Sequence, residues 1–173
     1  EACQKNGVKE ITEVKIGSDG IVIAMSKDAP EMDLTLKEIF LALAKDVPDP
    51  KGGEKVVPNP YKKWSDIDAS LPNTPINVMG PPPTSGTRDA FVEIAMEGGC
   101  KQFGWIKALE KTDGAKYKTI CHSMREDGPF VEAGENDNLI VQRLGQDKEV
   151  LGIFGYSFLM ENEGTVKAAT IEG

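Results

Sequence analysis

A chain of 173 residues with 39% hydrophobic and 28% charged residues has the size and composition of one globular domain. Its formal net charge is −8 and its basic residues are interspersed with acidic ones, which excludes the lysine- and arginine-rich face that a nucleic-acid partner requires. No apolar run approaches the roughly 20 residues that a membrane-spanning helix needs, so insertion into a membrane is not expected either.

The first part of the chain predicts two strands and one helix. Residues 11–16 alternate apolar and polar side chains, a Gly-Ser-Asp-Gly turn follows at 17–20, and residues 21–24 are continuously apolar, which is typical of a strand pair. A helix is predicted to begin with a Thr-x-x-Glu capping box at 35–38 and to end at Pro48. Its apolar face contains Leu36, Ile39, Phe40, Leu43 and Val47.

The middle of the chain is rich in loops. Residues 49–75 are too polar and too dense in proline for a core element, whereas Ile-Asn-Val-Met-Gly at 76–80 predicts a short buried strand. A helix is then predicted to begin near Arg88 and to stop at Gly98-Gly99. One face of this helix contains Phe91, Ile94 and Ala95.

The next segments have weaker patterns. Residues 100–111 are weakly helical, and residues 117–134 indicate a mixture of strand and turn. Residues 135–147 predict a short helix that is capped near Asn136 or Asp137 and ended by Gly145.

The last segments predict sheet. Residues 150–160 indicate a strand broken by glycine, and residues 165–172 indicate an edge strand. Because strands and helices alternate along the chain, the pattern predicts an α/β architecture.

The chain contains three cysteines, Cys3, Cys100 and Cys121, and one histidine. No pair has the C-x-x-C spacing, and a single histidine cannot complete a usual zinc set, so neither a metal site nor a cofactor is expected. We interpret Cys100 and Cys121, near the ends of two expected elements, as a disulfide formed in an oxidising compartment; two buried free thiols are the alternative. Cys3 is either free or paired outside this chain.

A stiff stretch at 80–91, Gly-Pro-Pro-Pro-Thr-Ser-Gly-Thr-Arg-Asp-Ala-Phe, joins the expected strand to the expected helix. The first N–H groups of a helix have no intrahelical partner and carry partial positive charge. Ser85 and Thr87 add hydroxyl donors, Gly86 permits close approach, and Arg88 offers a planar fork suited to an oxyanion. The stretch therefore predicts an anion-binding elbow; the alternative is an ordinary N-cap followed by a solvated arginine. It matches neither a Walker A loop nor the G-x-S-x-G motif of hydrolases.

Other polar residues are expected to be structural. His122 follows Cys121 in an expected strand without a base or metal set beside it, and Tyr156 is expected to pack within a sheet. In the turn after Arg125, that arginine can neutralise one of the two acids at 126–127.

The stretch at 80–91 resembles the phosphate-gripping segment of the substrate-binding proteins of bacterial phosphate ABC transporters. Other pieces resemble that family in the same order and cover nearly the whole chain: IGSDGIVIAMSK, LTLKEIFLAL, WSDID, LPNTPINVMGP, REDGPFVEAGENDNLIV and VLGIFGYSFL. The resemblance implies a periplasmic-binding-protein-like fold of type II, in which two α/β lobes close on the ligand. Family members are longer, so residues 1–173 are expected to be the central ligand-binding lobe alone, a mixed sheet flanked by helices.

The resemblance also implies roles for the elbow. Ser85, Gly86 and Thr87 would donate to phosphate oxygens, and Arg88 would pair with the anion, because prolines occupy the earlier position where some members carry an arginine. Asp89 could hold Arg88 in place. The protein is then expected to be a periplasmic binding protein and not an enzyme. As part of the full-length protein, it is expected to deliver inorganic phosphate to a membrane ABC permease. The acceptor for the phosphate proton would lie in the other lobe, so this chain is expected to bind weakly and to discriminate poorly against sulfate.

Two alternatives remain from the sequence. A phosphate-ester hydrolase or transferase could use the same elbow as an oxyanion cradle, and turnover of a phosphate ester distinguishes it from a binding protein. A binding protein for molybdate, sulfate or phosphonate could share the fold, and a panel of anions separates these ligands.

Overall fold

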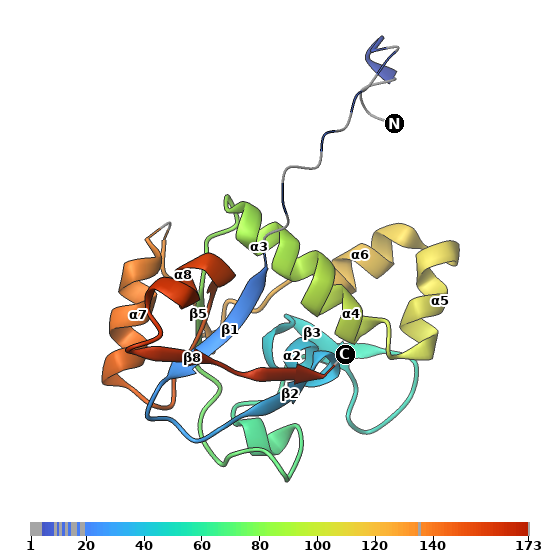
Figure 1. Cartoon of the computed structure of the whole chain (residues 1–173). Coiled ribbons are helices and arrows are strands. Elements are labelled where there is room, and N and C mark those ends of the chain that lie inside the picture. Colours follow the sequence, from blue (N-terminus) through green and yellow to red (C-terminus); the bar gives the residue numbers. More distant parts are fainter. Residues whose placement is uncertain are drawn as a thin grey trace.

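The structure is a computed structural model that describes residues 5–8, 10, 12, 14, 17, 20–134 and 136–172. Its centre is a five-stranded sheet with helices on both sides (Figure 1). The strand order is β6 (Phe130–Glu132), β5 (Val78–Gly80), β7 (Leu151–Gly155), β1 (Ile21–Ser26) and β8 (Val166–Ala168). The sheet is mixed, because β5 runs parallel to β6 and β7 whereas β1 is antiparallel to β7 and β8. The expected α/β class with a mixed sheet is therefore confirmed.

Two short strand pairs lie outside this sheet. Strand β2 (Asp33–Thr35) pairs in parallel with β9 (Thr170–Glu172), and β3 (Asp46–Pro48) pairs antiparallel with β4 (Val56–Pro58). A 3-10 turn, η1, follows at Trp64–Asp66. The expected edge strand at 165–172 is thus two strands, of which β8 forms an edge of the main sheet.

The helices account for most of the remaining chain. Those described are α2 (Leu36–Leu43), α3 (Gly86–Phe91), a π-helical turn η2 (Val92–Met96), α4 (Glu97–Cys100), α5 (Gly104–Thr112), α6 (Gly114–His122), α7 (Asp137–Gln146) and α8 (Tyr156–Glu161). Backbone angles at the junctions of α3, η2 and α4 are all helical, so the three form one continuous rod from Gly86 to Cys100 (Figure 1).

The core has one cluster on each face of the sheet. Alternation along β1 sends Ile23 and Met25 to the cluster beneath α2 and η2, and Ala24 to the cluster beneath α7 and α8. Strand β7 does the same with Ile153 and Phe154. Because both faces are covered, these strands read as continuous apolar runs in the sequence.

The helix predicted to start at 35–38 is confirmed at its beginning and wrong at its end. The Glu38 amide donates to Thr35 Oγ1 at 3.2 Å and the Thr35 amide donates to Glu38 Oε2 at 2.7 Å, which completes the capping box. The helix ends at Leu43, not at Pro48. Val47 fits the helical spacing, but residues 46–48 pair with β4 as strand β3, and there Val47 is fully buried.

Two predicted glycine stops are also wrong. Gly98 and Gly99 lie inside α4. Glycine is needed at position 99, because a side chain there would collide with the carbonyl oxygen of Leu36 where α4 packs on α2. Gly145 lies inside α7, which ends one residue later at Gln146; the cap at Asn136 is as expected. These glycines allow close packing against a neighbouring element instead of ending helices.

Two segments predicted as sheet are partly helical. Residues 114–122 form α6, which Asp113 caps by accepting the Lys116 amide at 3.1 Å, so His122 ends a helix. Tyr156 is the first residue of α8 and is 49% exposed, so it is not a packed sheet residue. The predicted strand at 11–16 and Cys3 lie largely or wholly outside the described residues.

Candidate functional site

The elbow that the sequence singled out lies at the carboxyl edge of the main sheet. Strands β5, β6 and β7 run parallel, so their carboxyl ends meet at one edge, and Gly80 at the end of β5 pairs with Glu132 at the end of β6. The chain leaves Gly80 through three prolines and enters α3 at Gly86. Ligands of open α/β sheets are characteristically bound at such an edge.

The backbone of the elbow leaves donors at the start of α3. The Ser85 amide donates to the Pro82 carbonyl at 3.0 Å, and the first helical hydrogen bond runs from the Asp89 amide to the Ser85 carbonyl at 3.1 Å. The amides of Gly86, Thr87 and Arg88 therefore precede the first helical turn and have no intrahelical acceptor.

The ordinary N-cap arrangement is not what the elbow shows. Ser85 has the extended backbone of an N-cap residue, with φ −87° and ψ 133°, but its side chain makes no capping hydrogen bond within this described turn. A Cβ added to Gly86 would meet nothing within 4 Å, and its φ is not positive, so packing and backbone strain do not require glycine there. A hydroxyl, three amides and an open backbone therefore face the same end of the helix.

The side chain of Arg88 folds back under the elbow. Its Nη1 donates to the Pro81 carbonyl at 3.1 Å, and its guanidinium lies 4.5 Å from the ring centroid of Phe130. Within the described residues, no hydrogen bond or ion pair joins Arg88 to Asp89, the expected anchor. Burial lowers the pKa of Arg88, and the negative charges of Glu132, Glu126 and Asp89 oppose that shift. Neither of these two direct anchors, Pro81 and Phe130, could be recognised from the sequence pattern around Arg88.

A polar cavity of about 290 Å³ adjoins Arg88 on one side of the rod. His122 lines it but is already engaged, because its Nε2 lies 2.7 Å from Oε2 of Glu97. Burial opposes ionisation of Glu97, but hydrogen bonds from Lys101 and His122 outweigh burial and lower its pKa to about 2. The contact with Glu97 therefore supports the structural role expected for His122.

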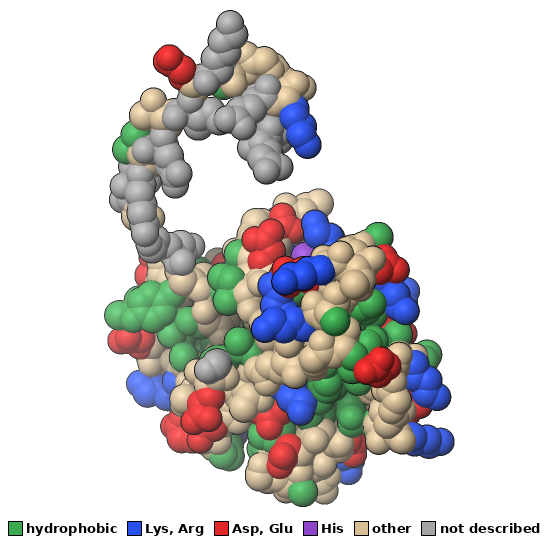
Figure 2. All heavy atoms as spheres, turned by 90° about the vertical axis from the view of Figure 1, so that its right-hand side faces the viewer, with side chains coloured by type: hydrophobic (Ala, Val, Ile, Leu, Met, Phe, Trp, Pro, Cys, Tyr) green, Lys and Arg blue, Asp and Glu red, His purple; other side chains and the backbone are tan. Residues whose placement is uncertain are grey.

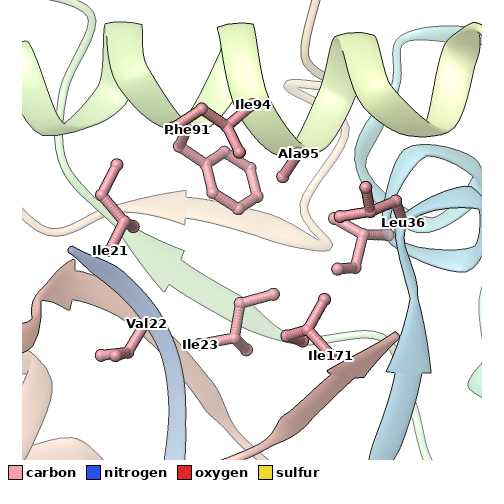
Figure 3. Close-up of a pocket in the computed structure, with 9 residues that line it drawn as sticks. Ile21, Val22, Ile23, Leu36, Phe91, Ile94, Ala95 and Ile171 are labelled. Atoms are coloured by element: carbon pink, nitrogen blue, oxygen red, sulfur yellow. The ribbon is translucent and has the colours of Figure 1, made fainter. Parts of the chain in front are cut away.

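A second cavity of about 290 Å³ lies between β1, the α3–η2 part of the rod, α2 and β9 (Figure 3). All of its lining side chains are apolar: Ile21, Val22, Ile23, Leu36, Ile39, Phe91, Ile94, Ala95 and Ile171. Ile94 shares the apolar face predicted with Phe91 and Ala95 but is 66% exposed at the rim. The cavity offers no polar side chain to an anion, so the elbow is the better candidate site.

Two further features of the described residues bear on the site. Within that part of the chain, no group of three or more His, Cys, Asp or Glu side chains is arranged to hold a metal ion. None of the helices described there has the length and apolar character needed to cross a bilayer. On the face that carries α5 and α6, basic and acidic side chains are interspersed (Figure 2).

Parallel strands whose carboxyl edge meets the start of a helix are the geometry at which α/β domains characteristically bind ligands. Residues 1–173 match the PBP superfamily domain, and the chain belongs to that family. It is a distant homologue of phosphate-binding proteins and of the substrate-binding proteins of phosphate ABC transporters, as the sequence predicted.

Three relatives illustrate the match. Protein SphX of Synechococcus elongatus is 29% identical over 171 residues, which are 99% of this chain and 40% of the relative. Phosphate-binding protein PstS of Staphylococcus epidermidis is 29% identical over 160 residues, which are 92% of this chain and 37% of the relative. An ABC-type phosphate transport receptor from Vibrio cholerae superposes with a TM-score of 0.53 at 16% identity, over 98% of this chain and 60% of the other. The chain thus spans about two fifths of the curated relatives, and the expected type II fold is confirmed.

Proposed function

We propose that this chain binds inorganic phosphate at the elbow formed by Ser85, Gly86, Thr87 and Arg88. The observation that carries the proposal is the uncapped start of α3: the Ser85 side chain makes no capping bond, and the space over Gly86 is open. Relatives named as phosphate-binding proteins favour phosphate over other oxyanions as the ligand.

The physical basis is a set of neutral donors supplemented by one cation. Amides at a helix start and two hydroxyls stabilise an oxyanion without adding net charge, and the Arg88 guanidinium supplies planar, charge-assisted hydrogen bonds. A protein of net charge −8 can bind an anion in this way, because local donors at short range outweigh a screened overall field.

We further propose that residues 1–173 act as the central lobe of a two-lobed solute-binding protein. The curated relatives are about two and a half times as long as the part that matches, and a clamshell site takes donors from both lobes. The phosphate proton then meets its acceptor outside this chain, so the chain by itself binds weakly and discriminates poorly against sulfate, which lacks that proton.

The cellular setting follows from the same proposal. The protein works in the periplasm and hands phosphate to a membrane ABC permease as part of the full-length protein. The buried disulfide between Cys100 and Cys121 supports an oxidising compartment. Two of the relatives are named as a phosphate-binding protein and as a phosphate transport receptor, which favours binding over turnover of a phosphate ester.

The test is a titration of the chain with phosphate, sulfate, molybdate and a phosphonate, followed by calorimetry or amide chemical shifts. Phosphate is expected to shift the amides of residues 85–88, and the variants Ser85→Ala and Thr87→Val are expected to weaken binding without loss of stability. Thr35→Ala is the matched control: it removes a true cap, so it lowers stability by about 1 kcal/mol and leaves binding unchanged. Hydrolysis of a phosphate ester would support the enzyme alternative, and sub-micromolar, phosphate-selective binding by this chain would overturn its assignment as one lobe.

A further inference from the structure

We propose that Phe130 is a positioning residue for anion binding, and that its ring together with the Pro81 carbonyl fixes the Arg88 guanidinium at the elbow. The inference rests on the proposed function for the identity of the ligand. Phe130 belongs to strand β6 and Arg88 to helix α3, and the two residues are 42 positions apart in the chain.

The ring itself is firmly held. Phe130 is the first residue of β6, is 6% exposed and belongs to the larger core cluster. It pairs with Val78 of β5, two residues before Gly80. A Cβ added to Gly80 would lie 2.9 Å from Cε2 and 3.0 Å from Cζ of Phe130, so the ring fills the space that a side chain at Gly80 would need. Gly80 therefore keeps the ring where it can meet the guanidinium.

The contact restrains the arginine on two sides. The guanidinium carbon lies 4.5 Å from the ring centroid, within the range of a favourable cation–π contact, and Nη1 donates to Pro81 at 3.1 Å. Among the described residues this is the one hydrogen bond of the Arg88 side chain, so the guanidinium keeps further donors that are not engaged there. An arginine that is already held loses less rotamer freedom when the anion binds.

The surrounding charges explain why such restraint matters. Glu132, Glu126 and Asp89 all act electrostatically on Arg88. A freely moving guanidinium in this environment would pair with one of these carboxylates, and the anion would then have to displace it. The aromatic ring holds the cation without neutralising it, which a carboxylate anchor would do.

The experiment is a double-mutant cycle with Phe130→Leu and Arg88→Ala, read out by phosphate titration of the full chain. Phe130→Leu is expected to weaken phosphate binding about three- to tenfold, the range for one side chain that must be ordered on binding. In the Arg88→Ala background the same change is expected to have no further effect, because the ring acts through the arginine. Phe130→Tyr, which keeps the ring, is expected to retain affinity.

The control is Phe40→Leu, which removes a buried ring of the same core cluster away from Arg88. It is expected to lower stability as Phe130→Leu does and to leave affinity unchanged. A separate readout needs no ligand: the Nε–H signal of Arg88 is expected to lose its ring-current shift in Phe130→Leu.

The outcomes separate the two proposals. Unchanged affinity in Phe130→Leu, or an equal loss in both backgrounds, overturns the positioning role whatever the ligand is. If sulfate or molybdate binds in place of phosphate and the cycle shows coupling with that anion, the positioning role stands and phosphate as the ligand is wrong. If no oxyanion binds the chain, both proposals are wrong.

Discussion

Cys100 at the end of α4 and Cys121 near the end of α6 are joined by a disulfide, with Cα atoms 5.5 Å apart and both residues fully buried. Between them lies the helical hairpin of α5 and α6, so the bond closes this hairpin at its base (Figure 1). The sequence left two buried free thiols as an alternative, and the structure confirms the disulfide.

Removing this disulfide is expected to lower stability and to leave the elbow intact. The bond closes a loop of 21 residues, for which the chain-entropy relation gives about 3 kcal/mol. The double variant Cys100→Ala, Cys121→Ala is therefore expected to unfold at lower urea concentration than the oxidised protein. A reductant should shift the midpoint of the unaltered protein in the same direction and should not change that of the variant. An unchanged midpoint in the variant would contradict the prediction.

Gly86→Ala is expected to act in opposite directions on stability and on binding. A Cβ at the first position of α3 meets open space, so alanine is expected to stabilise the fold by about 0.5–1 kcal/mol. The same Cβ would stand between the backbone and a bound oxyanion, and phosphate affinity is expected to fall about tenfold, equivalent to 1.4 kcal/mol. Thermal unfolding and phosphate titration measure the two effects.

Gly114→Ala is the matched control for this change. Gly114 also opens a helix, α6, and a Cβ there also meets open space. It is expected to give the same gain in stability with no change in affinity. If both variants behave alike toward phosphate, Gly86 has no role in binding.

Glu97 is expected to make stability depend on acid pH. Its pKa is lowered from 4.5 to about 2 in the folded protein, because the hydrogen bonds from Lys101 and His122 outweigh the effect of burial. The unfolded chain therefore binds the proton more readily, so the stabilisation is present above pH 4.5 and is lost as the pH falls toward 2. Urea unfolding of Glu97→Gln should show a flatter pH dependence over this interval than the unaltered protein. Parallel curves for the two proteins would contradict this account.

The elements that were predicted correctly are marked by sequence patterns within their own residues. The capping box at Thr35 and Glu38 and the apolar strand that ends at Gly80 are local patterns, and both are found in the structure. Val47 shows the limit of periodicity, since its position fits a helix, whereas pairing with β4 places it in a strand. Helix α6 was missed because its stability comes from packing and from the disulfide at Cys121, not from a clear apolar period.

The candidate site likewise combines residues that a local motif indicates with residues that only the fold brings together. Ser85, Gly86, Thr87 and Arg88 are consecutive, so one short motif was enough to suggest them. Phe130 and the Pro81 carbonyl meet Arg88 only because β6 pairs with β5 and the elbow turns back over that edge. Phe130 could have been noted as an aromatic residue at the start of the strand Phe-Val-Glu, but nothing in the local sequence connects it to Arg88.

The buried side chain of Arg125 supports a prediction about stability. Its side chain is 1% exposed; Nε and Nη2 donate to the Asp127 carboxylate at 2.6 and 2.7 Å, and Nη1 donates to the carbonyls of Ala42 and Tyr61 at 3.0 and 2.9 Å. These bonds connect the end of α2, the loop at Tyr61 and the segment that leads to β6. The pair of bonds to the carboxylate strongly lowers the pKa of Asp127.

Arg125→Lys is expected to lower the free energy of unfolding by about 1–3 kcal/mol. The ammonium of lysine lacks the planar fork of arginine and cannot reach all of these acceptors, so at least one buried acceptor is left unpaired. Urea unfolding measures the loss, with Arg143→Lys as the control, since Arg143 pairs with Asp147 at the surface and contributes less than about 1 kcal/mol. Equal stability of the two lysine variants would show that the buried fork contributes no more than a surface ion pair.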